Sequence, residues 1–255
     1  MTNQQIAEKL FLAYENQELT ENLAKSDAVT TFEDAYEIQK MITGKKLNIL
    51  GEKIVGAKVG LTSKAALAAN NMKDPFFAPL TDKDLFSGDL SMLKCPGLSL
   101  VELEIIFKAL SDISADATEE EIIKNTQIAL AVEIPTRRTI RPENIVNVTA
   151  DLGAAGNVFY LDQFIPTPNK DALAVFKGKI YLNDEIIAEG TSKAVLDNPI
   201  NTVIFANKMM NKLYGPIKKG MFILSGSLTP PLPIAKGTYR FIIEGLGEAA
   251  FCVSD

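Results

Sequence analysis

The stretch LSLVELEIIF, residues 98–107, is the part of the chain that decides the predicted fold. Side chains of a β-strand point alternately to its two faces. Read as a strand, this stretch has one face that is apolar from Val101 to Phe107, and on its other face Glu102 and Glu104 stand side by side between apolar residues. The apolar face carries Val101, Leu103, Ile105 and Phe107, and the other face adds Leu98, Leu100 and Ile106 to the two glutamates. The pattern therefore predicts a strand that buries one side and presents two carboxylates on the other.

Two explanations fit this pair of carboxylates. Glu102 and Glu104 would lie roughly 6.5 Å apart along the strand, so both could bind one cation. No Lys or Arg within the run neutralises them. A solvent-exposed edge strand is the alternative, although exposed faces are usually polar along their whole length. Because burying two unpaired like charges is costly, we favour a divalent-metal site.

A third carboxylate fits the metal explanation. Glu133 is the only charged residue of the apolar segment IALAVEIP, residues 128–135. Three acidic oxygen ligands without His or clustered Cys suit a hard cation, Mg²⁺ or Mn²⁺, and not zinc or copper. The chain has no His, so a general base must be Lys, Asp, Glu, Tyr or Cys. This excludes Ser-His-Asp and Cys-His catalysis.

The composition is that of a globular protein. Of the 255 residues, 47% are hydrophobic, which is enough for a substantial core. The formal net charge of -6 argues against a nucleic-acid partner. Cys95 and Cys252 do not make a disulfide framework, the N-terminus has no signal-peptide pattern, and no apolar run reaches membrane length. We therefore expect a soluble cytoplasmic protein without a nucleic-acid or membrane partner.

The N-terminal part of the chain reads as helical. Apolar residues recur at helical spacing over residues 3–16, which predicts a first helix. Thr30 and Glu33 form a capping-box pattern, which predicts a second helix that runs to about residue 50. We expect both helices to serve packing, and a mostly buried strand to follow over residues 53–61.

Lys58 is the unusual residue of this strand. Its neighbours in the sequence KIVGAKVGL, residues 53–61, are small and apolar. Burial lowers the pKa of a lysine because desolvation disfavours the ammonium form, and a lowered pKa suits proton transfer near neutrality. The alternative is a lysine that extends to solvent from a strand end. The strand alone does not separate these two explanations.

The rest of the chain predicts a strand-rich α+β fold. Residues 62–97 read as an irregular loop with a short Ala-rich helix, in a position to form a lid over a site. Thr118 and Glu121 form a further capping box. No Gly-x-Gly-x-x-Gly motif or phosphate-binding loop follows a strand, which argues against a nucleotide cofactor. Strands are expected over residues 145–149, 157–161, 172–182, 185–189, 221–225 and 239–243, with one helix from Pro199 to Gly215.

Six separated motifs resemble one enzyme family. They are AYEIQ at residues 35–39, GAKVGLTS at 56–63, VELEIIF at 101–107, AVEI at 131–134, SGSLT at 225–229 and GLG at 245–247. In this order they resemble the 2-keto-4-pentenoate hydratase and 4-oxalocrotonate decarboxylase branch of the fumarylacetoacetate hydrolase superfamily. The resemblance covers nearly the whole chain.

The resemblance implies an α+β fold of the fumarylacetoacetate hydrolase type, a mixed β-sandwich or roll with N-terminal helices. Residues 1–52 would form the helical region and residues 53–255 the β-rich catalytic domain, together one structural unit. A small 2-oxo or dienol acid is the implied substrate, and we expect a homo-oligomer. The implied ligands of Mg²⁺ or Mn²⁺ are Glu102, Glu104 and Glu133, with Lys58 as the acid/base. The implied substrate-binding residues are Leu61, Thr62, Ser63, Asp151, Ser225 and Thr229.

Three segments depart from the family pattern. The family's Pro-Asp-Phe-Gly is PFFA at residues 75–78, its Asp-Asn-Ala-Ser is DLGA at residues 151–154, and its Glu-Ile-x-Asp-Ser-Arg loses the Asp in EIPTR at residues 133–137. The metal ligands persist, whereas two acidic groups, an amide and a hydroxyl are lost. A drier pocket is poorer at positioning a nucleophilic water, so these changes bear on hydration.

Three functions are therefore compared. The first is a metal-dependent hydratase, a lyase that adds water to 2-hydroxypenta-2,4-dienoate (2-keto-4-pentenoate) and gives 4-hydroxy-2-oxopentanoate. The second keeps the metal but decarboxylates a 2-oxo acid of the 4-oxalocrotonate type, or hydrolyses a C–C bond of an acylpyruvate. The third is a non-catalytic subunit that supports a catalytic partner. Whole-chain likeness favours the first, and the thinned polar pocket favours the second.

Overall fold

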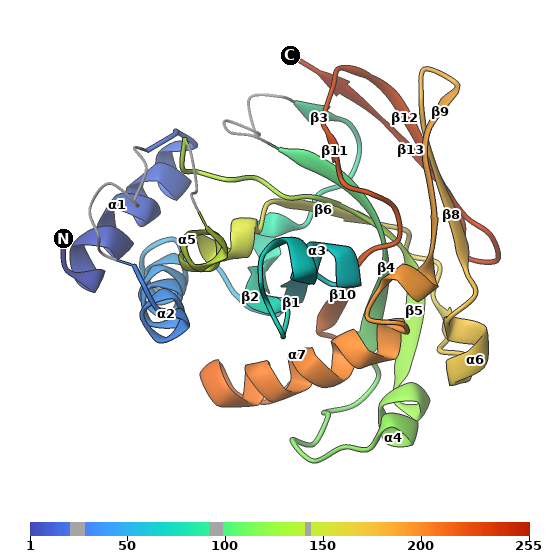
Figure 1. Cartoon of the computed structure of the whole chain (residues 1–255), viewed down its shortest axis with the longest axis horizontal. Coiled ribbons are helices and arrows are strands. Elements are labelled where there is room, and N and C mark those ends of the chain that lie inside the picture. Colours follow the sequence, from blue (N-terminus) through green and yellow to red (C-terminus); the bar gives the residue numbers. More distant parts are fainter. Residues whose placement is uncertain (21–28, 92–98, 141–143) are drawn as a thin grey trace.

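Two β-sheets organise the structure, a computed structural model that describes residues 1–20, 29–91, 99–140 and 144–255. The larger sheet has the strand order β2-β1-β10-β4-β5-β6, with β11 paired to β4 and β7 paired to β5. The smaller sheet has the order β3-β13-β12-β8-β9. Figure 1 shows α1, α2 and α5 on one side of the larger sheet and the smaller sheet on its other side. The mixture of helices with two mainly antiparallel sheets confirms the α+β prediction.

The elements have the following bounds. The helices are α1 (Asn3–Asn16), α2 (Phe32–Ile49), α3 (Lys64–Ala69), α4 (Glu119–Lys124), α5 (Ile145–Ala150), α6 (Lys170–Leu173) and α7 (Pro199–Leu213). The strands are β1 (Ile54–Gly60), β2 (Phe76–Thr81), β3 (Leu90–Ser91), β4 (Leu100–Ala109), β5 (Thr126–Ile134), β6 (Asn157–Tyr160), β7 (Ile165–Pro166), β8 (Lys177–Leu182), β9 (Glu185–Thr191), β10 (Phe222–Ser227), β11 (Leu232–Pro233), β12 (Gly237–Ile243) and β13 (Gly247–Ser254).

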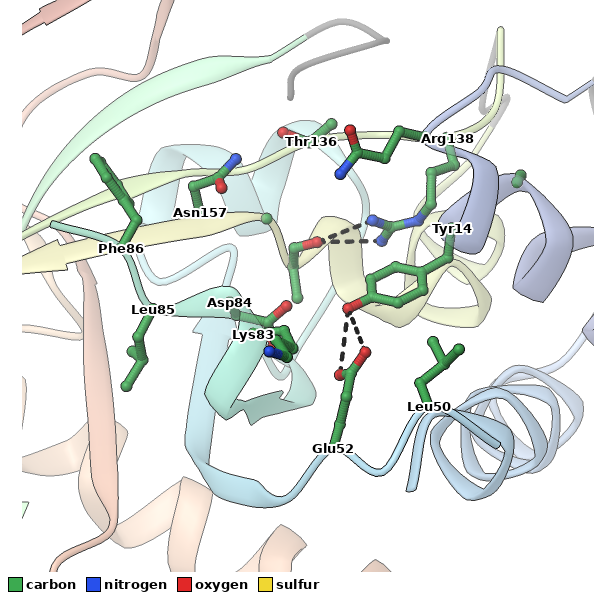
Figure 2. A pocket seen from close by; sticks show the side chains of 14 residues that line it. Tyr14, Leu50, Glu52, Lys83, Asp84, Leu85, Phe86, Thr136, Arg138 and Asn157 are labelled. Carbon is green, nitrogen blue, oxygen red and sulfur yellow. Dashed lines mark hydrogen bonds between the residues drawn. The ribbon is translucent and has the colours of Figure 1, made fainter. Parts of the chain in front are cut away.

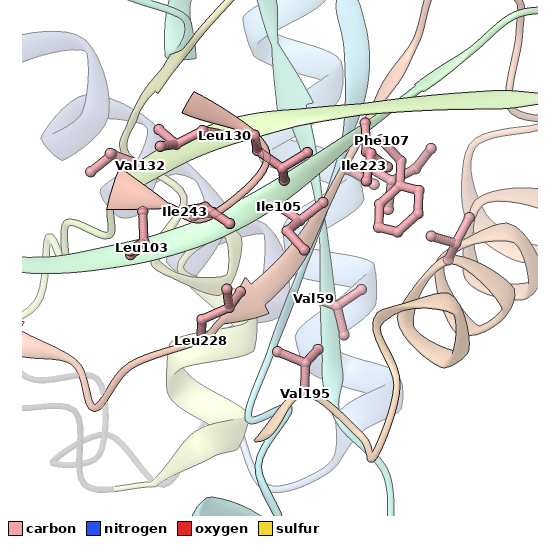
Figure 3. Close-up of a cluster of buried hydrophobic side chains, with 14 of the residues drawn as sticks. Val59, Leu103, Ile105, Phe107, Leu130, Val132, Val195, Ile223, Leu228 and Ile243 are labelled. Atoms are coloured by element: carbon pink, nitrogen blue, oxygen red, sulfur yellow. The ribbon is translucent and has the colours of Figure 1, made fainter. Parts of the chain in front are cut away.

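The apolar face of β4 lies in the core between the two sheets, as its alternation predicts. Leu103, Ile105 and Phe107 are fully buried and pack with residues of β5, β10 and β12 (Figure 3). Burial of side chains of this size stabilises the fold by about 1.5–3 kcal/mol each. Leu98, at the start of the predicted strand, and Cys95 lie outside the described residues.

The opposite face of β4 is covered by the N-terminal helices. Ile106 packs in a second apolar cluster with Ile6 of α1 and Ile38 of α2. Glu104 alternates with Ile105 and is therefore on this covered face, where it is 1% exposed. Since β4 lies between β10 and β5 within the sheet, the solvent-exposed edge strand considered for the two glutamates is wrong.

Helix boundaries agree with the sequence except at one cap and two segments. One of these is the start of the strand predicted over residues 172–182, where α6 forms and β8 begins only at Lys177. Helix α2 is capped by Thr31, whose hydroxyl accepts from the N–H of Asp34, one residue later than the predicted cap. Residues 145–149 form α5, although their β-branched side chains predicted a strand. The Asn144 side chain caps α5, and the helix packs against α2, so tertiary packing overrides the local β-propensity.

Strand β2 was not foreseen in the loop predicted over residues 62–97, because Pro79 reads as a strand breaker. Pro79 pairs with Ala57 of β1, and β2 ends the strand order of the larger sheet, where a missing N–H is tolerated. The Ala-rich helix predicted in this loop is α3. None of the helices within the described residues is both long enough and apolar enough to cross a membrane.

Candidate active site

Three glutamates meet on the helix-covered face of the larger sheet. In the antiparallel pairing of β4 with β5, Glu102 stands opposite Glu133 and Glu104 stands opposite Ala131. One carboxylate oxygen from each glutamate lies within 4.8 Å of the others. Glu104 and Glu133 are buried, and Glu102 is partly buried. The register of two strands therefore places three acidic groups around one point.

Lys58 of β1 reaches the same point from the other side. Its Nζ donates a hydrogen bond to the Gly153 carbonyl at 3.0 Å and lies 3.1 Å from Glu133 Oε1. The same ammonium stands 5.5 Å from the centre of the Phe76 ring. Only 3% of the residue is exposed, so the explanation in which Lys58 extends to solvent is wrong.

Burial and mutual repulsion dominate the electrostatics of the three glutamates. Burial, followed by the charges of Glu133 and Glu102, raises the pKa of Glu104 well above its usual value. Burial raises the pKa of Glu133 to about 7, against the opposing effect of Lys58. The pKa of Glu102 is also raised by burial. The single ammonium of Lys58 does not balance three carboxylates, so the cluster is unfavourable when all three groups are ionised.

The pKa of Lys58 differs from the value expected from sequence. Burial lowers it, but the charges of Glu133, Glu102 and Glu104 more than offset burial and leave it raised. The sequence expectation of a lowered pKa is wrong for this arrangement, because the strand alone does not reveal three carboxylates around the ammonium. In the arrangement described, Lys58 is an acid that holds its proton.

The three carboxylates fit a hard divalent cation. Within the described part of the chain, Glu104 Oε1 and Glu133 Oε1 are buried and accept no hydrogen bond, although Glu133 Oε1 has the Lys58 ammonium beside it. The other oxygen of Glu104 accepts the N–H of Gly226 at 2.7 Å, which fixes the direction of its carboxylate. Buried carboxylate oxygens with free lone pairs are the donor set that Mg²⁺ and Mn²⁺ prefer.

Two of the predicted substrate-binding segments meet beside Glu104. A Cβ added to Gly226 would lie 2.1 Å from Thr62 Oγ1, so residues 61–63 and 225–229 are in contact there. Leu61 has a positive φ of 60°, and Thr62 is buried. Thr229 Oγ1 is buried without a hydrogen-bond partner among the described residues. The structure thus places the Thr62 side chain against Gly226, whose N–H donates to Glu104.

The other predicted substrate-binding side chains are engaged by neighbouring groups. Ser63 caps α3 by accepting the N–H of Ala66. Ser225 Oγ accepts the N–H of Ile105 and donates to the Gly226 carbonyl. Asp151 is buried in an ion pair with Arg138 at 2.7 Å. These contacts favour a supporting role for the three side chains.

Four site features were missed by sequence reasoning. Phe76 and the Gly153 carbonyl contact Lys58. The sequence does not show these contacts, because they arise only when β2 pairs with β1 and the turn after α5 lies beside Lys58 of β1. Ser227 Oγ is buried without a partner among the described residues, and Ser227 pairs with Glu104 across the sheet. The SGSLT motif includes this hydroxyl and was the signal that could have found it. Arg138 has an identical neighbour, Arg137, but counted from Glu133 the Arg of the family's Glu-Ile-x-Asp-Ser-Arg pattern falls on Arg138, which was the signal that could have found it.

A cavity of about 410 Å³ lies to one side of this cluster, between α1, Leu50 and residues 83–86 (Figure 2). The Tyr14 hydroxyl donates to both carboxylate oxygens of Glu52, at 3.0 and 3.2 Å. Lys46 Nζ lies 3.4 Å from Glu52 and 3.5 Å from Asp84. The described residues that line the cavity include neither Lys58 nor the three glutamates, and its carboxylates Glu52 and Asp84 are paired with Lys46. We therefore place the chemistry at the glutamate cluster.

Comparison with known proteins shows the family of this chain. The 2-keto-4-pentenoate hydratase of Paraburkholderia xenovorans (strain LB400) is 31% identical over 226 residues, which are 85% of this chain and 81% of that protein. This chain belongs to the 2-keto-4-pentenoate hydratase family. Another family member, the 2-hydroxyhexa-2,4-dienoate hydratase of Comamonas testosteroni, is 29% identical over 96% of this chain and 98% of its own length. The relatives of the family are lyases named as hydratases, so the predicted enzyme class is confirmed.

The fold has a solved counterpart outside the hydratases. The structure of 4-oxalocrotonate decarboxylase from Pseudomonas putida G7, complexed with magnesium and adipate, superposes with a TM-score of 0.89 at 24% sequence identity and covers 98% of this chain and 97% of that one. At this identity the likeness shows a shared fold. No protein-family model matches the chain.

Proposed function

We propose that this chain is a divalent-metal-dependent hydratase that converts 2-hydroxypenta-2,4-dienoate to 4-hydroxy-2-oxopentanoate. The observation that carries the proposal is the cluster of three glutamates, two of them buried, with Lys58 beside it, in a chain whose relatives are named hydratases. The magnesium named for the decarboxylase structure of the same fold supports the choice of Mg²⁺ or Mn²⁺. Glu102, Glu104 and Glu133 would hold this cation, which would supply Lewis-acid polarisation of the substrate's 2-oxygen.

Lys58 is the proposed acid/base. From substrate to product, the 2-hydroxyl loses its proton, C5 and C3 each gain one, and hydroxide from water is added at C4. The ammonium of Lys58 is held against the glutamates by the Gly153 carbonyl, so it can donate a proton to a carbon of the bound dienol and recover one from its oxygen. Its burial keeps bulk water from exchanging that proton at the wrong moment.

The neighbouring hydroxyls would orient the substrate carboxylate. We propose that Thr229 Oγ1 and Ser227 Oγ, which have no partner among the described residues, donate to it. Leu61 and Thr62 would form the adjacent wall. Ser63, Asp151 and Ser225 would support the site through the hydrogen bonds that they already make; these three were predicted to bind substrate directly. A small 2-oxo or dienol acid matches such a set of donors.

A second function has one observation in its favour. The Phe76 ring packs beside the Lys58 ammonium, and a Cβ added at Gly60 or Gly153 would collide with it. An aromatic wall excludes water, which suits decarboxylation of a 4-oxalocrotonate-type acid, or C–C cleavage of an acylpyruvate, better than water addition. We retain it as the alternative because the named relatives are hydratases.

The absorbance of 2-hydroxypenta-2,4-dienoate tests both functions. Purified protein is mixed with the dienol in the presence of Mg²⁺, Mn²⁺ or chelator, and products are identified by mass spectrometry. Metal-dependent loss of the dienol with formation of 4-hydroxy-2-oxopentanoate establishes the hydratase. No loss, together with carbon dioxide release from 4-oxalocrotonate, establishes the decarboxylase. Lys58→Ala should abolish turnover while metal still raises the melting temperature, and retained turnover would contradict the role of Lys58.

The organisation of the chain is part of the proposal. The apolar cluster of α1 and α2 includes residues of β4, β5 and β10, which supports one structural unit made of residues 1–52 and 53–255. Leu85, beyond β2, bridges to Val158 of β6, so the two ends of the larger sheet approach each other. This supports the mixed sandwich or roll of the fumarylacetoacetate hydrolase type. A homo-oligomer and a cytoplasmic location stay predictions from the sequence.

A further inference from the structure

A left-handed turn stands between Arg138 and Lys58. Leu152, Gly153 and Ala154 have consecutive φ values of 52°, 60° and 55°. Glycine adopts such values readily, but in leucine and alanine the Cβ atom clashes with the backbone. Two of the three residues are therefore in a conformation that they do not prefer. The turn persists only if other contacts hold it.

Arg138 holds both ends of this turn. Its Nε donates to Asp151 Oδ1 at 2.7 Å, and its backbone N–H donates to Asp151 Oδ2 at 2.8 Å. Its Nη2 donates to the Asp151 carbonyl at 3.2 Å, and its Nη1 donates to the Ala155 carbonyl at 3.1 Å. The side chain is buried, so these bonds form away from bulk water. One planar guanidinium thus fixes the residue before the turn and the residue after it.

The middle of the turn faces Lys58. The Gly153 carbonyl accepts the hydrogen bond from Lys58 Nζ at 3.0 Å. The direction of a carbonyl follows the φ and ψ of the residues on either side of it. If the turn relaxed to the right-handed region, this carbonyl would leave the ammonium, and Lys58 would keep only the glutamates as partners.

We propose that Arg138 is a positioning residue for Lys58: it holds residues 152–154 in the left-handed conformation that aims the Gly153 carbonyl at the lysine ammonium. The inference rests on the proposed function in one respect, the use of Lys58 in turnover. Arg138 itself does not touch the reacting atoms. Its role is to hold the strained turn so that the Gly153 carbonyl stays in place as the acceptor for Lys58 Nζ.

The substitution Ala154→Gly, combined with Arg138→Lys, supplies the decisive test. Arg138→Lys keeps the charge beside Asp151 but lacks the planar fork that reaches the Ala155 carbonyl as well. We expect kcat to fall about 10- to 100-fold with KM changed by less than about threefold, because a proton carrier is misplaced while substrate contacts stay. Adding Ala154→Gly removes the strain at one of the two non-glycine residues of the turn, and should restore part of kcat. If Arg138 bound the substrate directly, Arg138→Lys would instead raise KM, and Ala154→Gly would not restore it. This result would overturn the proposal.

A matched control separates this rescue from general stabilisation. Asp184 has a φ of 68° in the hairpin between β8 and β9, on the smaller sheet. Asp184→Gly relieves strain of the same kind away from Lys58. In combination with Arg138→Lys it should raise the melting temperature without restoring kcat. Equal rescue by both glycines would overturn the proposal.

A second readout needs no substrate. Brief acetylation of the metal-free protein, read by peptide mass spectrometry, reports the exposure of each lysine. Lys58 and Lys46 have side chains only 4% and 2% exposed, so both should be protected in the wild type. Arg138→Lys should raise labelling of Lys58 at least about fivefold by local opening, leave Lys46 protected, and be reversed by Ala154→Gly. Because this assay is independent of turnover, it decides the role of Arg138 even if the proposed reaction is wrong.

The labelling outcomes are unambiguous. Unchanged Lys58 labelling in Arg138→Lys, or parallel labelling of Lys46 and Lys58, would overturn the proposal. If Arg138→Lys does not fold, Ala154→Val tests the same turn with the guanidinium intact. A β-branched residue disfavours the positive φ, so Lys58 labelling must rise; protection equal to wild type would overturn the proposal.

Discussion

Replacement of Glu104 by glutamine should stabilise the metal-free protein and abolish its response to metal. Burial and two neighbouring carboxylates raise the pKa of Glu104 well above 4.5, so as pH rises above 4.5 the folded state keeps a proton on this group that the unfolded chain loses. At pH 7.5, keeping such a carboxyl group protonated costs up to about 4 kcal/mol, and at pH 5 less than about 1 kcal/mol. Glutamine is neutral and still offers an oxygen to the Gly226 N–H.

We therefore expect Glu104→Gln to raise the unfolding free energy in chelator by about 2–4 kcal/mol at pH 7.5, equivalent to roughly 5–15 °C in melting temperature, and by less than about 1 kcal/mol at pH 5. Saturating Mg²⁺ should raise the melting temperature of the wild type and leave the variant unchanged. Calorimetry or denaturant unfolding at both pH values, with and without Mg²⁺, measures all four quantities.

A second buried glutamate serves as the control. Glu52 accepts hydrogen bonds from Tyr14 and Thr81 and pairs with Lys46, so its charge is compensated. Glu52→Gln should therefore destabilise the protein by about 2 kcal/mol or more. If Glu104→Gln were destabilising in chelator, or if its effect did not change with pH, the reasoning about an uncompensated carboxylate cluster would be refuted.

Three further predictions concern pH, backbone and cavity. The folded-state pKa of Glu133 is raised from 4.5 to about 7, so its contribution to stability is fully present below pH 4.5 and is lost as pH rises through 7. The unfolding free energy of the metal-free protein should therefore decline between pH 5 and 8. An unfolding free energy that does not change over this range would contradict the prediction. Gly226 has a φ of 94° and no room for a Cβ beside Thr62. Gly226→Ala should therefore lower the unfolding free energy by about 2 kcal/mol or more in denaturant unfolding, and weaken metal binding. Wild-type stability and wild-type metal affinity would argue against the close contact. Tyr14→Phe removes the donor to Glu52 and should cost about 1–2 kcal/mol with kcat unchanged, whereas a loss of turnover would place the cavity in the active site.

The local sequence pattern was sufficient to predict β4, the strand that carries Glu102 and Glu104. The period-two alternation of residues 98–107 separated an apolar face from the face with Glu102 and Glu104, because strand geometry allows only these two directions. The capping residues of α1, α4 and α7 likewise act within four residues of the chain and are readable without a fold. Where packing opposes local preference, as in α5 and β2, sequence reasoning failed.

The sequence by itself determined which residues we propose for the chemistry: a set of carboxylates without histidine, and one lysine in apolar surroundings. Tertiary structure alone decided their register, in which Glu133 of β5 stands opposite Glu102, and the charge that Lys58 keeps. Electrostatic energies depend on distances between groups far apart in the chain, and those distances exist only after the strands pair. Tertiary structure also decided the turn that Arg138 holds, because its strained backbone is stable only through contacts that folding supplies.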